Sequence, residues 1–179
     1  MSKAIDDLKS EHDAILSGLQ ILDAITSRIN RGLEVDKKSV HDFMGFLKEF
    51  ADKCHHGKEE GILFPAMAKG GITDMAPIKE MLAEHARARE LIRNMDSAFA
   101  GKLDYAGFAR AAEGYKALMQ THIEKENGAL LRTADTTLGE AQLSQLSEAF
   151  AQHEQKAIGS GRHEELHSML KALRQKYFI

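Results

Sequence analysis

Apolar residues recur along most of the chain at alternating steps of three and four positions, which is the spacing of an amphipathic α-helix. The period-two alternation of a half-buried strand is absent from the sequence. Breaks rich in glycine or polar residues interrupt the pattern at positions 30–32, 69–73, 101–102 and 133–137. The pattern predicts an all-α protein with four long helices, over about residues 2–29, 36–68, 76–100 and 104–132.

The remaining residues predict two further helices. A capping box of Thr137 and Glu140 is expected to open the first, and a glycine-rich break at positions 159–161 separates it from the second. Short connections favour antiparallel neighbouring helices. We therefore expect residues 1–134 to form an up-down-up-down four-helix bundle and residues 135–179 to form a C-terminal helical extension packed on that bundle.

Three of the bundle helices carry a histidine at a position that the pattern assigns to the core. The first helix has the apolar seam Ile5, Leu8, His12, Ile15, Leu19, Leu22 and Ile29. The third helix has the seam Ile78, Met81, His85, Ala88, Ile92, Met95 and Phe99. The fourth has Phe108, Ala111, Tyr115, Leu118 and His122. We expect all three histidines to point inward.

The second helix has a less regular apolar seam than the other three. Its seam is Phe43, Phe46, Phe50, Lys53, Gly57, Glu60, Phe64 and Met67. This register predicts that Glu60 faces the core, with His56 one turn before it. Lys53 and Gly57 are poor core residues, so they indicate a cavity or a local bulge in the helix.

The spacing of these polar residues is typical of a metal site. At a rise of about 1.5 Å per residue, the four inward histidines lie at similar distances from the connecting loops, so we expect them in one layer. His56 and Glu60 share a helix face, as do His122 and Glu126. Imidazole and carboxylate are donors that suit iron or manganese, and one carboxylate can bridge two ions. Four histidines and two glutamates therefore suffice for two metal ions.

Each histidine alone has a simpler interpretation. A single histidine on an apolar seam is more often a hydrogen-bonded core residue than a ligand. Four inward histidines at one level, two of them followed by glutamate, favour a metal site, since every buried imidazole needs a partner.

Four segments also carry a resemblance to a known family. They are residues 11–13 (EHD), 54–65 (CHHGKEEGILFP), 84–85 (EH) and 122–127 (HIEKEN). Over about residues 1–134 the sequence resembles the hemerythrin-like (HHE cation-binding) family. The resemblance implies a four-helix bundle with an oxo- or carboxylate-bridged di-iron centre. Its terminal ligands would be His12, His56, His85 and His122, and its bridges Glu60 and Glu126.

Arg89 departs from the oxygen-carrying members of that family, which have a second ligating histidine one turn after His85. An arginine cannot donate a lone pair. The set of four histidines and two glutamates is similar instead to the proteins that repair damaged iron–sulfur clusters. Those proteins also have a cysteine-bearing N-terminal module, which this sequence lacks.

Several other residues have a structural interpretation that we prefer to a functional one. His55 and Glu59 have the spacing of a ligand pair, but about 100° per residue places them beside His56 and Glu60, so we expect them at the rim of the site. We expect Cys54 to be a small core residue, and Tyr115 to pack in the core or line a cavity. His163 and His167, preceded by His153 and Glu154, have the separation of a second metal pair. However, Leu166, Leu170, Leu173 and Tyr177 make an ordinary docking stripe beside them.

Composition narrows the functional classes. The chain has 179 residues, 43% of them hydrophobic, and a formal charge of −3 without a basic face, which disfavours nucleic acid as a partner. A single cysteine excludes an internal disulfide and a multi-cysteine metal site. The sequence has neither a signal peptide nor a run long enough to span a bilayer, so we expect a cytoplasmic protein without a membrane partner.

Three hypotheses follow. The first is a non-haem di-iron protein that binds or reduces nitric oxide, oxygen or peroxide, with an unidentified reductase as partner and a role in oxidative or nitrosative stress. The second is an oxygen or iron sensor, or an iron store, without turnover. The third is a helical interaction protein with vestigial ligands. For the first two we expect two iron ions as the cofactor, with manganese or zinc as alternatives.

Overall fold

The computed structural model describes residues 1–100 and 103–178, and every regular element in these ranges is a helix. The all-α prediction is therefore confirmed. The predicted break at residues 101–102 lies outside the described residues. Among the described helices, none is long and apolar enough to cross a membrane.

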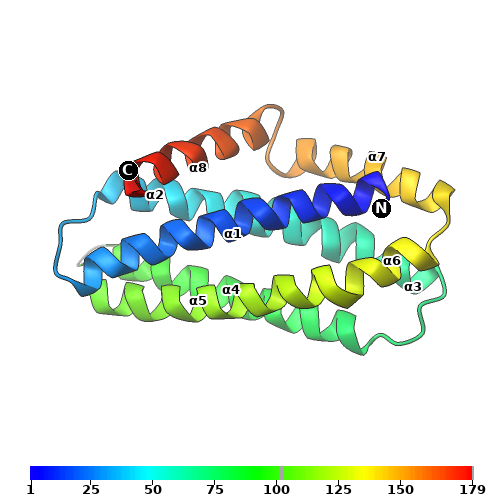
Figure 1. Ribbon diagram of the computed structural model, residues 1–179, viewed down its shortest axis with the longest axis horizontal. Helices are drawn as coiled ribbons and strands as arrows, with labels where there is room; N and C mark the ends of the chain where they lie inside the picture. The colour runs from blue at the N-terminus through cyan, green and yellow to red at the C-terminus, as the bar shows by residue number, and fades with distance from the viewer. Residues whose placement is uncertain (101–102, 179) are drawn as a thin grey trace.

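The bundle consists of four long helical rods (Figure 1). The first is α1 (Lys3–Asn30), and the third is α4 (Ala76–Phe99). The second rod runs without a break through α2 (Lys37–Phe46), η1 (Leu47–His56), η2 (Glu59–Leu63) and α3 (Phe64–Lys69). The fourth contains α5 (Tyr105–Lys125), η3 (Glu126–Leu130) and α6 (Leu131–Thr137). The three η segments are π-helical, with wider turns than an α-helix.

Local signals explain where the rods begin and end. The Asp36 side chain accepts a hydrogen bond from the Lys38 backbone amide at the start of α2, and Asp104 accepts one from Gly107 at the start of α5. Gly32 follows α1 with a φ of 67°, a conformation that a residue with a Cβ rarely adopts. These signals fix the short connections that make neighbouring rods antiparallel.

The C-terminal residues form α7 (Glu140–Ala157) and α8 (Arg162–Phe178), which lie end to end along one side of the bundle, against α1 and the second rod (Figure 1). Leu166, Leu170 and Leu173 are buried, as the docking stripe predicts. The prediction of an extension packed on a bundle is confirmed in this respect.

Two expectations about the junction were wrong. The fourth rod continues through the predicted break at positions 133–137, because Ala134 and then Leu138 are buried and hold this last turn against the bundle. Consequently α7 begins at Glu140, where the Gln142 side chain accepts a hydrogen bond from the Gly139 backbone amide at 3.0 Å. Thr137 lies in α6 and does not cap α7, so the expected Thr137–Glu140 capping box does not form.

Two separate apolar clusters fill the bundle. One contains residues of α1 from Ala14 onward, and the other contains Ala4, Ile5 and Leu8 at the start of the same helix. His12 falls between them on α1 and is fully buried. A buried polar layer therefore crosses the bundle between two apolar regions, and the candidate site lies in this layer.

Candidate metal centre

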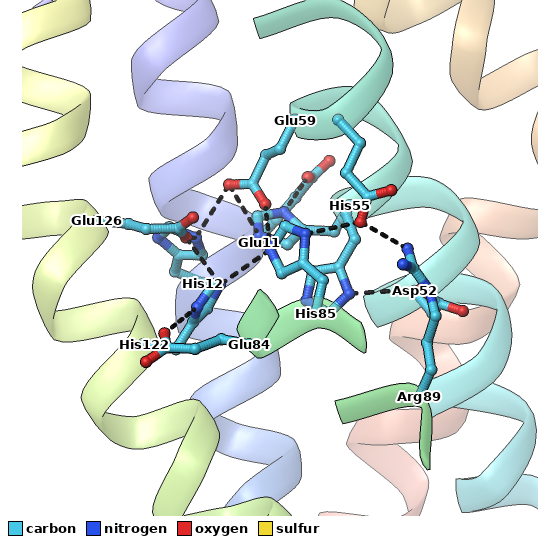
Figure 2. Close-up of polar contacts among 12 residues, drawn as sticks. Glu11, His12, Asp52, His55, Glu59, Glu84, His85, Arg89, His122 and Glu126 are labelled. Carbon is cyan, nitrogen blue, oxygen red and sulfur yellow. Dashed lines mark hydrogen bonds and ion pairs between the residues drawn. The ribbon is translucent and has the colours of Figure 1, made fainter. Parts of the chain in front are cut away.

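The polar layer contains seven side chains with no exposed surface. They are His12, His55, His56, Glu59, His85, His122 and Glu126. Groups of three or four of these residues bring one nitrogen or oxygen atom each to within 4.8 Å of the others. Figure 2 shows the carboxylates of Glu59 and Glu126 directed toward the histidine rings. The structure thus brings together five of the six residues expected from the sequence.

Glu60 is the exception. Its side chain is 28% exposed, and its carboxylate contacts Arg89 rather than the centre of the layer. Glu59 takes the inward position and His55 is buried beside it, so the expectation that His55 and Glu59 lie at the rim was wrong.

The π-helical turns of the second rod explain this change of register. A π-helical hydrogen bond spans five residues instead of four, so each wide turn adds one residue to the helix. The residues that face inward after Phe50 are therefore His55, Glu59 and Leu63. A regular α-helix would have placed Lys53, Gly57 and Glu60 there. The poor core residues Lys53 and Gly57 were the sequence signal of this bulge.

The two buried carboxylates lie between two groups of histidines. Glu59 Oε1 is 3.5 Å from His55 Nε2, and Glu59 Oε2 is 3.3 Å from His85 Nε2. Glu126 Oε2 is 3.1 Å from His12 Nε2 and 3.4 Å from His122 Nε2. One group, His12 with His55, we call the first position. The other group is the second position; it contains His56, His85 and His122, and the rings of His56 and His85 stack at 3.9 Å between centroids.

In four of the five histidines, Nδ1 donates a hydrogen bond to a polar side chain outside the layer. His12 Nδ1 donates to Asn127 Oδ1, and His55 Nδ1 donates to Glu11 Oε2, both at 2.9 Å. The remaining two bonds run from His85 Nδ1 to Glu60 Oε1 at 2.8 Å and from His122 Nδ1 to Glu84 Oε2 at 2.9 Å. These oxygens only accept, so the proton lies on Nδ1 and the Nε2 lone pair points into the layer.

Cations hold the outer carboxylates in turn. Arg89 donates to both Glu60 and Asp52, each at 2.7 Å, and Asp52 Oδ1 lies 3.4 Å from Nδ1 of His56. Lys125 donates to Glu84 at 2.5 Å. Arg89 therefore orients Glu60, the outer partner of His85, and His56 supplies the third imidazole of the second position.

Buried polar atoms without partners show that the layer suits a metal. The unpartnered atoms are Nε2 of His12, His55 and His56, Nδ1 of His56, and both carboxylate oxygens of Glu59 and Glu126. A buried carboxylate without a hydrogen bond is costly, and two of them side by side repel one another. Cations between the carboxylates and the imidazoles would satisfy these atoms together, so the residues present fit metal ions.

The proton affinities of four of the five imidazoles agree with this arrangement, whereas contact with Glu126 raises the pKa of His12 despite its burial. Burial and the nearby Glu126 charge raise the pKa of Glu59 well above its ordinary value. Burial lowers the pKa of His55 to about 4 and lowers the pKa of His56, His85 and His122 as well. Those four imidazoles are therefore neutral near pH 7, which is the form that donates a lone pair to a metal.

Comparison with known families agrees with the geometry. Residues 3–134 match the hemerythrin HHE cation binding domain. The chain belongs to this family. No curated protein and no solved structure matches the chain.

In this HHE domain all seven buried donors lie within the matched residues, and the match stops just before α7. The family implies the four-helix bundle that the described residues form, and its cation-binding character agrees with the buried histidine and glutamate groups. The C-terminal helices α7 and α8 lie outside the matched residues.

The remaining residues considered from the sequence lie outside the layer. Cys54 is fully buried, and burial raises the pKa of its thiol to about 12, so it is a core residue as expected. Tyr115 is a fully buried part of the larger apolar cluster. His163 lies near Glu11 and Glu154, which form a further group of potential donors with it.

Proposed function

We propose that the buried layer of this HHE domain holds two iron ions and that the protein binds or reduces a small ligand, namely nitric oxide, oxygen or peroxide. The observation that carries the proposal is the placement of two buried carboxylates between two groups of imidazoles. A bound pair of iron ions would supply the redox chemistry and the affinity for such a ligand.

The donor assignment follows from the distances. Glu59 has one oxygen toward each position, and Glu126 Oε2 lies near a histidine of each, so we propose both glutamates as bridges. His12 and His55 would hold the first ion, and His56, His85 and His122 the second. This assignment replaces Glu60 with Glu59 and adds His55 to the set expected from the sequence.

The two positions differ in their number of protein donors. The first has two histidines, and the second has three. Because both share the same two carboxylates, the first position has one protein donor fewer, and we propose that the small ligand binds there.

The surroundings of the layer favour a small ligand. All seven donors are fully buried between the two apolar clusters. A large or charged molecule would lose its hydration on entering such a region, whereas oxygen and nitric oxide are weakly hydrated, and hydrogen peroxide is small and uncharged. The outer partners Asn127, Glu11, Glu60 and Glu84 retain the protons on Nδ1 and keep the rings from rotating.

The likeness to iron–sulfur repair proteins rested on a set of four histidines and two glutamates. The fifth buried histidine changes that set, so we do not propose a repair role. Reaction with peroxide or nitric oxide would instead suit a response to oxidative or nitrosative stress.

The test is metal reconstitution of the full chain. The protein is stripped with a chelator, loaded anaerobically with ferrous iron, and its iron content and visible spectrum are recorded before and after oxygen, nitric oxide and peroxide. We expect about two irons per chain and a new absorption band with at least one ligand. Repeated turnover with a reductant would support reduction over a sensor or store, and a chain that retains no iron would refute the proposal.

A further inference from the structure

A buried lysine joins the C-terminal helices to the metal centre. Lys58 immediately precedes Glu59 on the second rod, and only 4% of its side chain is exposed. Its ammonium group donates to Glu11 Oε1 of α1 at 2.5 Å and to Glu154 Oε2 of α7 at 3.2 Å. Lysine is almost never buried without such partners, so these two carboxylates account for its position.

Glu11 connects this lysine to a donor histidine. Glu11 Oε1 accepts from Lys58. The other oxygen, Oε2, accepts from His55 Nδ1 at 2.9 Å, and Figure 2 shows these two residues side by side. The charge of Lys58 therefore keeps the Glu11 carboxylate in place, and the carboxylate orients His55. Without the ammonium group, the buried Glu11 carboxylate would lose its closest cation and would be drawn toward the solvent-accessible cleft that Glu11, Lys58 and Glu154 line.

The C-terminal helices complete this arrangement through close packing. His163 of α8 places Nε2 at 3.8 Å from both Glu11 Oε1 and Glu154 Oε2. On α7, His153 donates to the Lys53 carbonyl oxygen at 2.9 Å, and a Cβ at Gly57 would lie only 2.5 Å from the His153 ring. Gly57 thus permits α7 to approach the π-helical segment that carries His55.

The second position is supported differently. Its outer carboxylates are held by Arg89 of α4 and Lys125 of α5, both within the bundle. Among the outer partners described above, only Glu11 lies next to side chains that contact or belong to α7 and α8. These helices therefore support the first position and not the second.

We infer that Lys58 is a positioning residue for His55, through which α7 and α8 determine how firmly the first position holds its metal ion. This inference rests on the proposed function, since it requires two metal positions in the layer. It extends the site beyond the matched domain to Glu154 on α7 and His163 on α8.

The experiment follows metal release from the full chain. Parent and variant proteins are loaded anaerobically with cobalt(II), and its visible spectrum is followed after addition of excess EDTA. In Lys58→Met we expect one of the two cobalt ions to leave about 10-fold faster than in the parent, the lower end of the effect of losing an outer partner, because Lys58 acts through Glu11; the other ion should leave at the parental rate. Glu154→Gln should accelerate the same single phase to a smaller extent.

A second substitution separates positioning from loss of packing. The double variant Lys58→Met/Glu11→Gln removes the Glu11 charge together with the lysine, but the glutamine keeps an amide oxygen that can accept from His55. The accelerated phase of cobalt release should therefore slow toward the parental rate. Arg174→Met removes another contact between α8 and α1, the hydrogen bonds to Ser17 and Gln20, and should leave release unchanged.

The outcomes distinguish this inference from the proposed function. A parent chain that binds no cobalt would overturn both. A parent that binds two ions, with Lys58→Met and Glu154→Gln releasing them at parental rates, would overturn the inference alone, as would equal acceleration in Arg174→Met. If Lys58→Met does not fold, the release rates of Glu154→Gln and of its control Arg174→Met decide whether the inference holds.

Discussion

Two rods of the bundle deliver donor residues in different ways. α4 is a regular α-helix and contributes one donor, His85, whereas the second rod contains η1 and η2 and contributes His55, His56 and Glu59. In a regular helix, consecutive residues point about 100° apart, so His55 and His56 could not both face the layer equally. The wide turns allow both to do so. Local π-helical geometry thus concentrates side chains on one face that a regular helix would spread over several turns.

The largest expected effect comes from a bridge outside the second rod. Glu126→Ala should remove most of both metal ions, because Glu126 Oε2 lies near a histidine of each position. Elemental analysis after reconstitution measures the loss. The metal-free variant should also be less stable than the metal-free parent, because the truncation leaves a cavity in the buried layer and takes the Glu126 carboxylate away from His12 and His122; thermal unfolding checks this. Two ions retained in Glu126→Ala would remove this glutamate from the bridging role.

The next test separates the neighbouring histidines of η1. His55→Ala should lose the ion of the first position, and His56→Ala the ion of the second, because the two imidazoles belong to different donor groups. Each variant should therefore retain about one ion per chain. The remaining ion should give different cobalt spectra in the two variants. Identical spectra would show that His55 and His56 serve the same position.

A smaller effect is expected at the contact between α4 and the second rod. Arg89→Met leaves Asp52 and Glu60 without their shared cation, and we expect about 10-fold weaker binding at the second position. Arg89→His should weaken binding as Arg89→Met does and should not add a ligand, because His56 already supplies the third imidazole of the second position. Competition with a chelator measures the affinity. Tighter binding in Arg89→His would show that this position accepts a donor after all.

The smallest effect concerns the docking of α8 on η1. Arg162 donates two hydrogen bonds to Glu49 at 2.8 and 2.9 Å, but the pair is partly exposed, so Arg162→Met should cost at most about 1 kcal/mol of unfolding free energy. The hydrogen bonds from Arg162 lower the pKa of Glu49, so the contribution is present above the ordinary carboxyl pKa and is lost as the pH falls through the lowered value. Denaturant unfolding should therefore separate parent and variant at pH 7 and bring them together in acid. A difference that persists in acid would assign the effect to packing.

The regular parts of the bundle could be predicted from periodicity alone. His12, His85 and His122 are buried as expected because α1, α4 and α5 keep the α-helical register on which the pattern depends. Glu126 follows His122 by four residues and is buried for the same reason.

The rest could not be predicted, for two physical reasons. Periodicity assumes a constant number of residues per turn, so the π-helical turns moved the inward position from Glu60 to Glu59. Outer partners depend on contacts between distant segments, and Lys58 meets Glu154 across a separation of 96 residues. No local pattern reports such a contact, although Lys53 and Gly57 did indicate where the register would change.

We propose that the π-helical turns make Glu59, and not Glu60, the bridging residue of the second rod. The most direct measurement is the metal content of Glu59→Ala and Glu60→Ala after identical reconstitution. Glu59→Ala should lose most of both ions, whereas Glu60→Ala should retain about two, with weaker binding at the second position because His85 loses its outer partner. Full metal content in Glu59→Ala together with metal loss in Glu60→Ala would show that Glu60, and not Glu59, bridges the two ions.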